Sequence, residues 1–278
     1  TMPIVTISRG SYSRGREVAE KLAKKLQYDC VSREILLEAS EEFNIPEISL
    51  VRAIHDSPSV LERIRHGRER YISYYQYELL KYVQKDNVVY HGLAGQFFLR
   101  HISHVVKVRI LASPEDRLNE VMQRDGVGQR EAEHILRKDD EERRRWAMKL
   151  YGIDTWDSRL YDMVLLIDQL TVDDAVELIH AAVNKPAFET TEASQQTLND
   201  QLLCARIHAM LVNASLMVEV RVEEGVVSLC NLGEVLRSDS LLRGKIEEMI
   251  KGVEGVREIQ FGGKLCARPD HINPFYNI

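Results

Sequence analysis

Short apolar runs alternate with amphipathic stretches along residues 1–185. The runs are rich in Val, Ile and Leu, which is typical of buried strands, and they lie at residues 3–8, 87–91, 105–112 and 163–167. Between and after them, apolar residues recur mostly at helical spacing, over residues 16–26, 33–85, 114–149 and 172–183. Strands that alternate with helices predict an α/β fold, with a parallel sheet covered by helices on both faces.

The pattern changes after residue 184. Residues 184–200 are polar and contain Pro186, which indicates a linker. Beyond the linker we expect a small α+β unit with the order α-β-β-α-β, at residues 202–211, 216–222, 226–231, 240–251 and 256–261. The chain is therefore divided into a first domain, a linker, a second domain and a tail, at residues 1–185, 186–198, 199–265 and 266–278.

Composition narrows the classes of partner. The 278 residues carry a net charge of -6, so we expect no basic face for nucleic acid. No apolar stretch approaches the roughly 20 residues that span a bilayer. The four cysteines and nine histidines lack metal-ligand spacing, which favours reduced buried thiols, a cytoplasmic location and no resident metal.

A glycine loop stands between the first strand and the first helix, at residues 10–16. The backbone N–H groups of such a loop, together with the N-terminus of the next helix, bind phosphate. Gly10 and Gly15 have the spacing of the Walker A pattern, but Arg16 replaces its lysine and Glu17 its hydroxyl residue. Arg can bridge two phosphate oxygens, whereas Glu17 removes the hydroxyl that normally reaches Mg²⁺. A plain strand-to-helix turn is the alternative.

The segment VTISRGSYSRGREVAEKLAKKLQYDCVSREIL resembles the opening of the cytidylate kinase-like family, which are P-loop nucleoside monophosphate kinases. The resemblance covers about residues 2–185. It implies a P-loop kinase-type fold, ATP and Mg²⁺ as cofactors, and phosphoryl transfer to a nucleoside monophosphate such as CMP. The residues that it implies for ATP binding are Gly10, Ser11, Ser13, Arg14, Gly15, Arg16, Glu17 and Asp168.

Further motifs follow in the family's order. Arg33 matches the family phrase Asp-Arg-Glu-Ile, from which Ser32 departs, and Gly92 matches the phrase Gly-Arg-Gly, from which Leu93 departs. The segment ILRKDDEERRRWAMKLYG resembles the lid, whose arginines neutralise the transferring phosphoryl group. The resemblance implies substrate-binding roles for Arg33, Gly92 and Arg117, and catalytic roles for Arg16, Arg137, Asp140 and Arg143.

The C-terminal segments VEVRVEEGVVSLCNLGEV and IEEMIKGVEGVREIQ resemble the BON domain, a small α-β-β-α-β module. The matching positions are Gly225, Val227, Leu229, Gly233, Gly255 and Val256. They have structural roles at turns and core positions, so the match identifies a fold and not an active site. The resemblance implies binding of a small ligand or lipid, and we expect a regulatory or dimerisation role in a homodimer.

Each motif also has a structural interpretation. The arginines at 143–145 fit a solvated helix face, Asp139 and Asp140 fit ion pairs at i,i+4, and the tyrosines at 71–82 fit core packing as well as an acceptor platform. The leading hypothesis is an ATP-dependent kinase, because loop, acceptor helices, lid and last strand follow in the family's order. The alternatives are a catalytically weak nucleotide sensor that signals through the C-terminal module, or an interaction protein in which that module binds a lipid or partner.

Overall fold

The computed structural model describes residues 3–32, 67–92, 94–230 and 239–262. Contacts between residues divide the chain into two units. The first unit combines residues 1–38 with 85–194, and the second combines residues 39–84 with 195–278. Among the described residues, each unit has a sheet and a hydrophobic core of its own.

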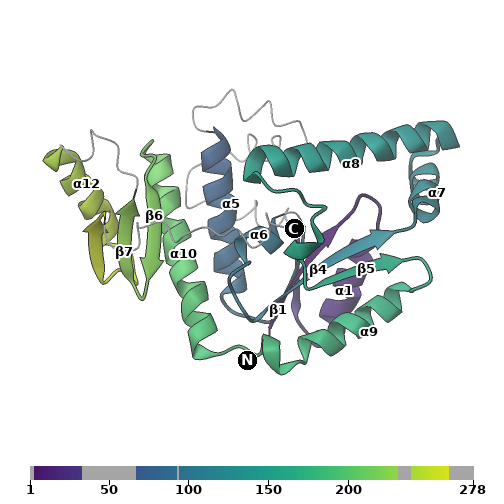
Figure 1. The fold of residues 1–278 in the computed structure, drawn as a ribbon, viewed down its shortest axis with the longest axis horizontal. Helices are drawn as coiled ribbons and strands as arrows, with labels where there is room; N and C mark the ends of the chain where they lie inside the picture. Colours follow the sequence, from purple (N-terminus) through teal and green to yellow (C-terminus); the bar gives the residue numbers. More distant parts are fainter. Residues whose placement is uncertain (1–2, 33–66, 93, 231–238, 263–278) are drawn as a thin grey trace. The chain divides into compact units, whose positions relative to one another are not determined.

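The first unit is built on a parallel five-stranded sheet (Figure 1). Its strands are β1 (Ile4–Arg9), β2 (Asp29–Ser32), β3 (Val88–His91), β4 (Val105–Ala112) and β5 (Met163–Ile167), and their order is β2-β3-β1-β4-β5. Its helices are α1 (Gly15–Leu26), α6 (Gly95–Phe98), α7 (Pro114–Asp125), α8 (Gln129–Tyr151) and α9 (Val172–Val183), with 3-10 turns at Ser158–Leu160 and Pro186–Phe188. The expected P-loop kinase-type α/β fold is confirmed.

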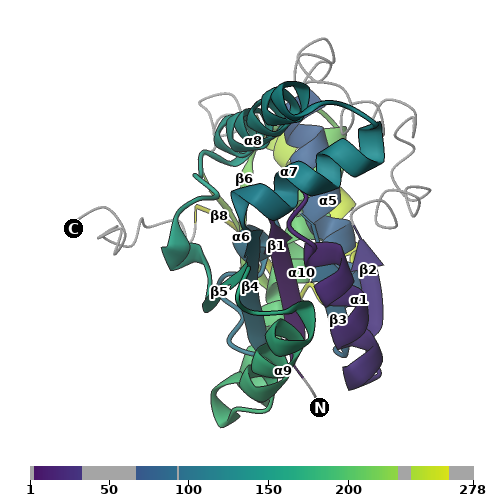
Figure 2. The same cartoon turned by 90° about the vertical axis from the view of Figure 1, so that its right-hand side faces the viewer.

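Helices α1 and α9 pack side by side on one face of this sheet (Figure 2). Ile7 of β1, Val18 of α1 and Ile179 of α9 are fully buried in the core that they share. Helix α9 begins at the predicted residue, because Thr171 and Asp174 form a capping box that pairs two backbone N–H groups. The apolar periodicity therefore predicted this layer correctly.

The polar segment before the second unit differs from its prediction. Residues 192–198 were expected in a linker, but they form the first turns of α10 (Glu192–Asn213). Thr191 Oγ1 accepts a hydrogen bond from the backbone N–H of Ser194, and Leu198 is fully buried. The helix predicted at residues 202–211 is the body of α10, and only its first turns were missed, because they are mostly polar and depend on one cap and one buried leucine.

The second unit contains α5 (Gly67–Val83), the body of α10, and a three-stranded sheet. The sheet places β7 (Val226–Cys230) between an antiparallel β6 (Glu219–Glu223) and a parallel β8 (Glu258–Phe261), and α12 (Ser240–Lys251) connects the last two strands. The expected small α-β-β-α-β arrangement is therefore present. The turn before β7 requires glycine, because Gly225 has φ 78° and a Cβ there would lie 2.6 Å from the carbonyl oxygen of Gly255.

Four of the tyrosines in α5 are buried. The side chains are between 1% and 4% exposed, and they are Tyr71, Tyr74, Tyr75 and Tyr77. The rings of Tyr71 and Tyr75 are stacked, with centroids 6.0 Å apart. This arrangement favours core packing over an acceptor platform for this helix.

The remaining expectations concern reduced thiols and helices that could cross a membrane. Cys30 and Cys204 are free thiols, but Cys230 is disulfide-bonded, so the prediction of reduced thiols is wrong at that position. None of the helices in the described ranges has the length and apolar character needed to cross a membrane.

Candidate functional site

The glycine loop lies at the carboxyl end of β1, the central strand of the first sheet. It leads into α1, whose N-cap residue, Arg14, makes no capping hydrogen bond with its side chain. Ser13 Oγ donates to the carbonyl oxygen of Gly10 at 3.0 Å and closes the turn. A loop with this placement directs an uncapped helix N-terminus toward the edge of the sheet where parallel α/β folds bind ligands.

Two residues without glycine's freedom adopt left-handed backbone conformations in the loop. Tyr12 has φ 56° and Arg14 has φ 57°. A side chain in this region costs about 1–2 kcal/mol, and such strain concentrates at functional sites. The glycines of this region are Gly10 and Gly15, so the two left-handed positions between them are occupied by residues that adopt this conformation at a cost.

Relieving this strain is expected to stabilise the fold. Arg14→Gly should raise the free energy of unfolding by about 1 kcal/mol, because Arg14 is exposed and its backbone is left-handed. Urea denaturation followed by circular dichroism measures the change. The matched control is Arg16→Gly, two residues further along and inside the first turn of α1, which should lower stability by about 0.5–1 kcal/mol. Equal effects of the two variants would contradict the assignment of strain to residue 14.

Helices α7 and α8 hold the loop through Arg117 and Tyr12. Arg117 Nε donates to the carbonyl oxygen of Ser11 at 2.8 Å, and its Nη2 donates to both carboxylate oxygens of Asp140 at 2.8 and 2.7 Å. Tyr12 Oη donates to Asp139 at 2.8 Å. Burial raises the pKa of Tyr12, and the bond to Asp139 raises it further, so the phenol stays a donor at neutral pH. Adjacent acidic residues of α8 thus anchor two successive residues of the loop.

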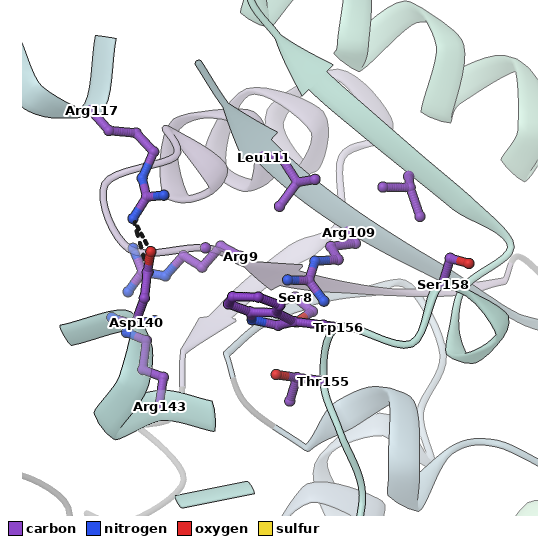
Figure 3. A pocket seen from close by; sticks show the side chains of 12 residues that line it. Ser8, Arg9, Arg109, Leu111, Arg117, Asp140, Arg143, Thr155, Trp156 and Ser158 are labelled. Carbon is purple, nitrogen blue, oxygen red and sulfur yellow. Dashed lines mark hydrogen bonds and ion pairs between the residues drawn. The ribbon is translucent and has the colours of Figure 1, made fainter. Parts of the chain in front are cut away.

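A pocket of about 360 Å³ opens beside this anchor (Figure 3). Its lining comes from the end of β1, from β4 and β5, from α7 and α8, and from the segment that follows α8; it comprises Ser8, Arg9, Gly10, Arg109, Leu111, Arg117, Asp140, Arg143, Thr155, Trp156, Ser158 and Val164. The β4 side chains that line it alternate with those packed against α1, so the pocket lies on the opposite face of the sheet.

The described lining is strongly cationic. It includes four arginines and one carboxylate, that of Asp140. An opening in which positive charge exceeds negative charge attracts anions, and guanidinium groups match the geometry of phosphate oxygens. The apolar side chains of Leu111, Val164 and Trp156 provide a second kind of surface in the same pocket.

A hydrogen-bonded tyrosine supports the floor of the pocket. Tyr161 Oη contacts Ser8 Oγ at 3.3 Å and donates to the carbonyl oxygen of Thr155 at 3.0 Å, and it accepts from Gln96 Nε2 at 3.3 Å. Burial raises the pKa of Tyr161, so its hydroxyl remains protonated at neutral pH. These bonds fix the segment after α8 on the end of β1.

The same segment carries an exposed aromatic side chain at the pocket. Trp156 is 56% exposed, and the guanidinium carbon of Arg144 lies 4.6 Å from its ring centroid. Arg144 also binds Asp154 at 2.5 Å, and this hydrogen bond lowers the pKa of Asp154. The indole is thus held by a cation that is itself anchored, which leaves much of its surface available.

The structure brings part of the predicted site together. Arg117, Asp140, Arg143 and Gly10 line one pocket. Ser11, Ser13, Arg14 and Gly15 form the adjoining loop and helix start. Asp140 contacts Arg117 directly, which the sequence did not indicate.

The other predicted residues lie outside this pocket. Arg16 is 70% exposed and its Nε binds Glu20 at 2.7 Å, while Glu17 binds Lys21 at 3.3 Å. Arg137 is exposed on α8. Gly92 continues the pairing of β3 with β1 through a bond to the carbonyl of Ile7, and Asp168 is exposed just beyond β5. Arg33 falls outside the described residues.

Sequence reasoning missed several lining residues. Arg9 and Arg109 are charged positions inside strands, and the alternation of Lys107 and Arg109 with apolar residues in β4 was an available signal. Trp156 gave none, because only the fold brings the segment after α8 back to β1. Within the described ranges, no group of three acidic, His or Cys side chains is placed to hold a metal ion.

Comparison with known proteins gives a consistent result. The model of a family described as "Cytidylate kinase-like family" matches residues 4–169. A cytidylate kinase of Pyrobaculum arsenaticum is 25% identical over 178 residues, which cover 64% of this chain and 90% of the relative. A cytidylate kinase of Archaeoglobus fulgidus is 28% identical over 184 residues, which cover 64% and 93%. The crystal structure of an uncharacterized protein from Eubacterium ventriosum matches with a TM-score of 0.51 at 21% identity, over 66% of this chain and 99% of that one, which shows a shared fold alone.

Proposed function

Because the chain belongs to the cytidylate kinase-like family, a family of nucleotide kinases, we propose that it transfers the γ-phosphoryl group of ATP·Mg²⁺ to a nucleoside monophosphate. The cytidylate kinases among its relatives make CMP the first acceptor to test. The observation that supports the proposal most is the pocket that joins the loop to four arginines and an apolar wall.

The donor would lie on the loop. Its phosphates would accept hydrogen bonds from the backbone at Ser13, Arg14 and Gly15 and face the N-terminus of α1. Arg16 would have to leave Glu20 to reach them. Mg²⁺ enters with ATP as part of the substrate. We assign Glu17 no direct contact with the metal, because its carboxylate is paired with Lys21.

The acceptor would occupy the pocket. Trp156 and the apolar side chains of Leu111 and Val164 suit the flat face of a base, and the arginines suit a phosphate. Asp168, exposed beyond β5, is retained as a contact for the base of ATP. Arg33 and Gly92 remain proposed acceptor contacts.

In the transfer step, an acceptor phosphate oxygen would attack the γ-phosphorus in line as the bond to the β–γ bridging oxygen breaks. Negative charge then spreads over the equatorial oxygens of the transferring group. Arg143 lies in the pocket on α8, and Arg117 lies between α8 and the loop; these locations support the proposal that both neutralise this charge. Arg137 is proposed to join them when substrates are bound.

The test is a panel of nucleoside monophosphates with ATP·Mg²⁺, with product nucleoside diphosphates separated by anion-exchange chromatography. At least one monophosphate, with CMP tried first, is expected to be converted, and removal of Mg²⁺ with EDTA should stop the reaction. Binding of ATP without conversion of any monophosphate would reject the kinase and support a nucleotide sensor. Failure to bind any nucleotide would reject both.

Residues 199–265, within the second unit, are proposed to form a BON-like regulatory module. Its α-β-β-α-β order and the glycine-dependent turn at Gly225 support this assignment. A small ligand or lipid, and a role in forming a homodimer, belong to the same proposal. Removal of residues 190–278, which takes away the whole of α10, should then leave phosphoryl transfer measurable while abolishing any response to such a ligand.

A further inference from the structure

One guanidinium of the pocket has an unfilled hydrogen-bonding position. Arg109 lies on β4, on the side of the strand that faces away from α1, and its Nη1 atom is buried. No hydrogen-bond partner for this atom exists among the described residues. Buried donors on charged groups are almost always paired in native proteins, so this position calls for a ligand or an ordered water molecule.

The surroundings of Arg109 hold it in place without filling that position. Its guanidinium carbon lies 5.6 Å from the ring centroid of Tyr161, and the hydroxyl of Tyr161 is fixed by Ser8 and Thr155. The neighbouring carboxylate of Asp154 is bound by Arg144 at 2.5 Å and by the backbone N–H of Trp156 at 3.0 Å. The side chain is therefore stacked and oriented, while the nearby carboxylate serves other donors.

The place of Arg109 in the pocket indicates which anion it takes. Arg117 already uses Nε and Nη2 for Ser11 and Asp140. Arg109 lies on the same face of β4 as Leu111, in the pocket that also contains Trp156. The loop that would hold the donor phosphates contributes Gly10 to the pocket, but the helix N-terminus that would bind them belongs to α1, which packs on the opposite face of the sheet. Because Arg109 lies on the face of the sheet away from α1, an anion beside it is assigned to the molecule that occupies the pocket.

We propose that Arg109 binds the phosphate of the acceptor nucleotide and thereby selects a nucleoside monophosphate over the free nucleoside. The inference rests on the proposed function and adds to it a specificity-determining residue on β4. A guanidinium and a phosphate form paired, charge-assisted hydrogen bonds, which are the stronger class of such bonds in proteins.

The test is a binding cycle measured by calorimetry. The ligands are the monophosphate that the panel selects, or CMP if none is converted, and its nucleoside without phosphate. In the unmodified protein the monophosphate should bind more tightly. In Arg109→Met, which keeps the aliphatic stem but removes the donors, the ratio of the two affinities should fall by about 10- to 100-fold. Arg109→Lys should restore part of the ratio, since it keeps the charge but not the planar fork.

The matched control is Lys107→Met. Lys107 lies two residues earlier on the same face of β4, but its Nζ binds Asp162 at 3.0 Å and it does not line the pocket. This variant should leave the affinity ratio unchanged. An unchanged ratio in Arg109→Met, or no binding of the monophosphate to the unmodified protein, would overturn the proposal. An equal fall in both variants would also overturn it, because the effect would then come from the strand.

Turnover separates this inference from the function on which it rests. In a converting enzyme, Arg109→Met should raise KM for the acceptor and leave KM for ATP within twofold. If the affinity ratio falls as expected but no monophosphate is converted, the kinase is rejected and the phosphate-binding role of Arg109 stands. If conversion occurs and the ratio does not change, the kinase stands and the role of Arg109 is rejected.

Discussion

Replacing Gly15 with alanine is expected to destabilise the first unit by about 1–3 kcal/mol and to weaken ATP binding about 100-fold. A Cβ at this position would lie 2.6 Å from the Cβ of Arg9, far inside van der Waals contact. Both carbons are attached directly to the backbone, so the clash is relieved only by moving the loop or the end of β1. Alanine's advantage over glycine within a helix, about 1 kcal/mol, opposes this effect but does not outweigh it.

Gly10→Ala is the matched control, because Gly10 is the other glycine of the loop. A Cβ there would have its nearest neighbours at 3.8 Å, on Leu111 and Ser13, and its φ is not left-handed. The fold should therefore retain its stability within about 0.5 kcal/mol. Urea denaturation gives the stabilities and calorimetry gives the ATP affinities. Gly15→Ala with unchanged stability and ATP binding would contradict the close approach of Arg9 to the loop.

The contrast between these glycines shows where the sequence was informative. The spacing of Gly10 and Gly15 predicted a phosphate loop, because a pattern on neighbouring residues reflects local backbone requirements. It did not predict that Arg9 makes Gly15 necessary, nor that Tyr12 and Arg14 adopt conformations usual for glycine. Those properties depend on how the loop packs against strands and helices distant in sequence.

Among the strands, too, those with a local sequence signal were predicted and those that depend on distant contacts were not. Apolar runs located β1, β3 and β4, because burial on both faces of a parallel sheet needs continuous apolar sequence. The edge strand β5 was located by its apolar run as well, although Val164 and Leu166 are exposed. β2 was missed, since its four residues include one aliphatic side chain, that of Val31, and the strand is defined by pairing with β3. Edge strands of this kind depend on a partner and carry little signal of their own.

The pocket could be predicted only in part for a related reason. Arg117, Asp140 and Arg143 were identified by the family's order of motifs. Their contacts, and the roles of Arg109 and Trp156, depend on which face of β4 is left open by α1 and on the return of the chain after α8. A charged residue within a buried strand, such as Arg109, is the sequence feature that indicates such a pocket.

The largest effect on the proposed phosphoryl transfer is expected from Arg117→Met. This change removes the donors to Ser11 and to both oxygens of Asp140, so the loop loses the link through Arg117 to α7 and α8 and keeps the hydrogen bond from Tyr12 to Asp139. The loss of a preorganised donor beside a transferring phosphoryl group costs about 100- to 1,000-fold in kcat, and we expect a fall in that range. Stability should fall less, by about 1 kcal/mol, because Asp140 is 28% exposed and water can replace its partner.

A double-mutant cycle with Asp140→Asn distinguishes an indirect role of Arg117, through its ion pair with Asp140, from a direct contact of Arg117 with the substrate. If Arg117 acts through Asp140, each single variant should lower kcat, and the double variant should be no worse than Arg117→Met alone. If Arg117 also contacts the phosphoryl group, Asp140→Asn should cost less than Arg117→Met. Arg145→Met is the control on α8, where an exposed pair with Glu141 should contribute less than twofold. Fully additive losses would show that Arg117 and Asp140 act independently, against the contact that joins them.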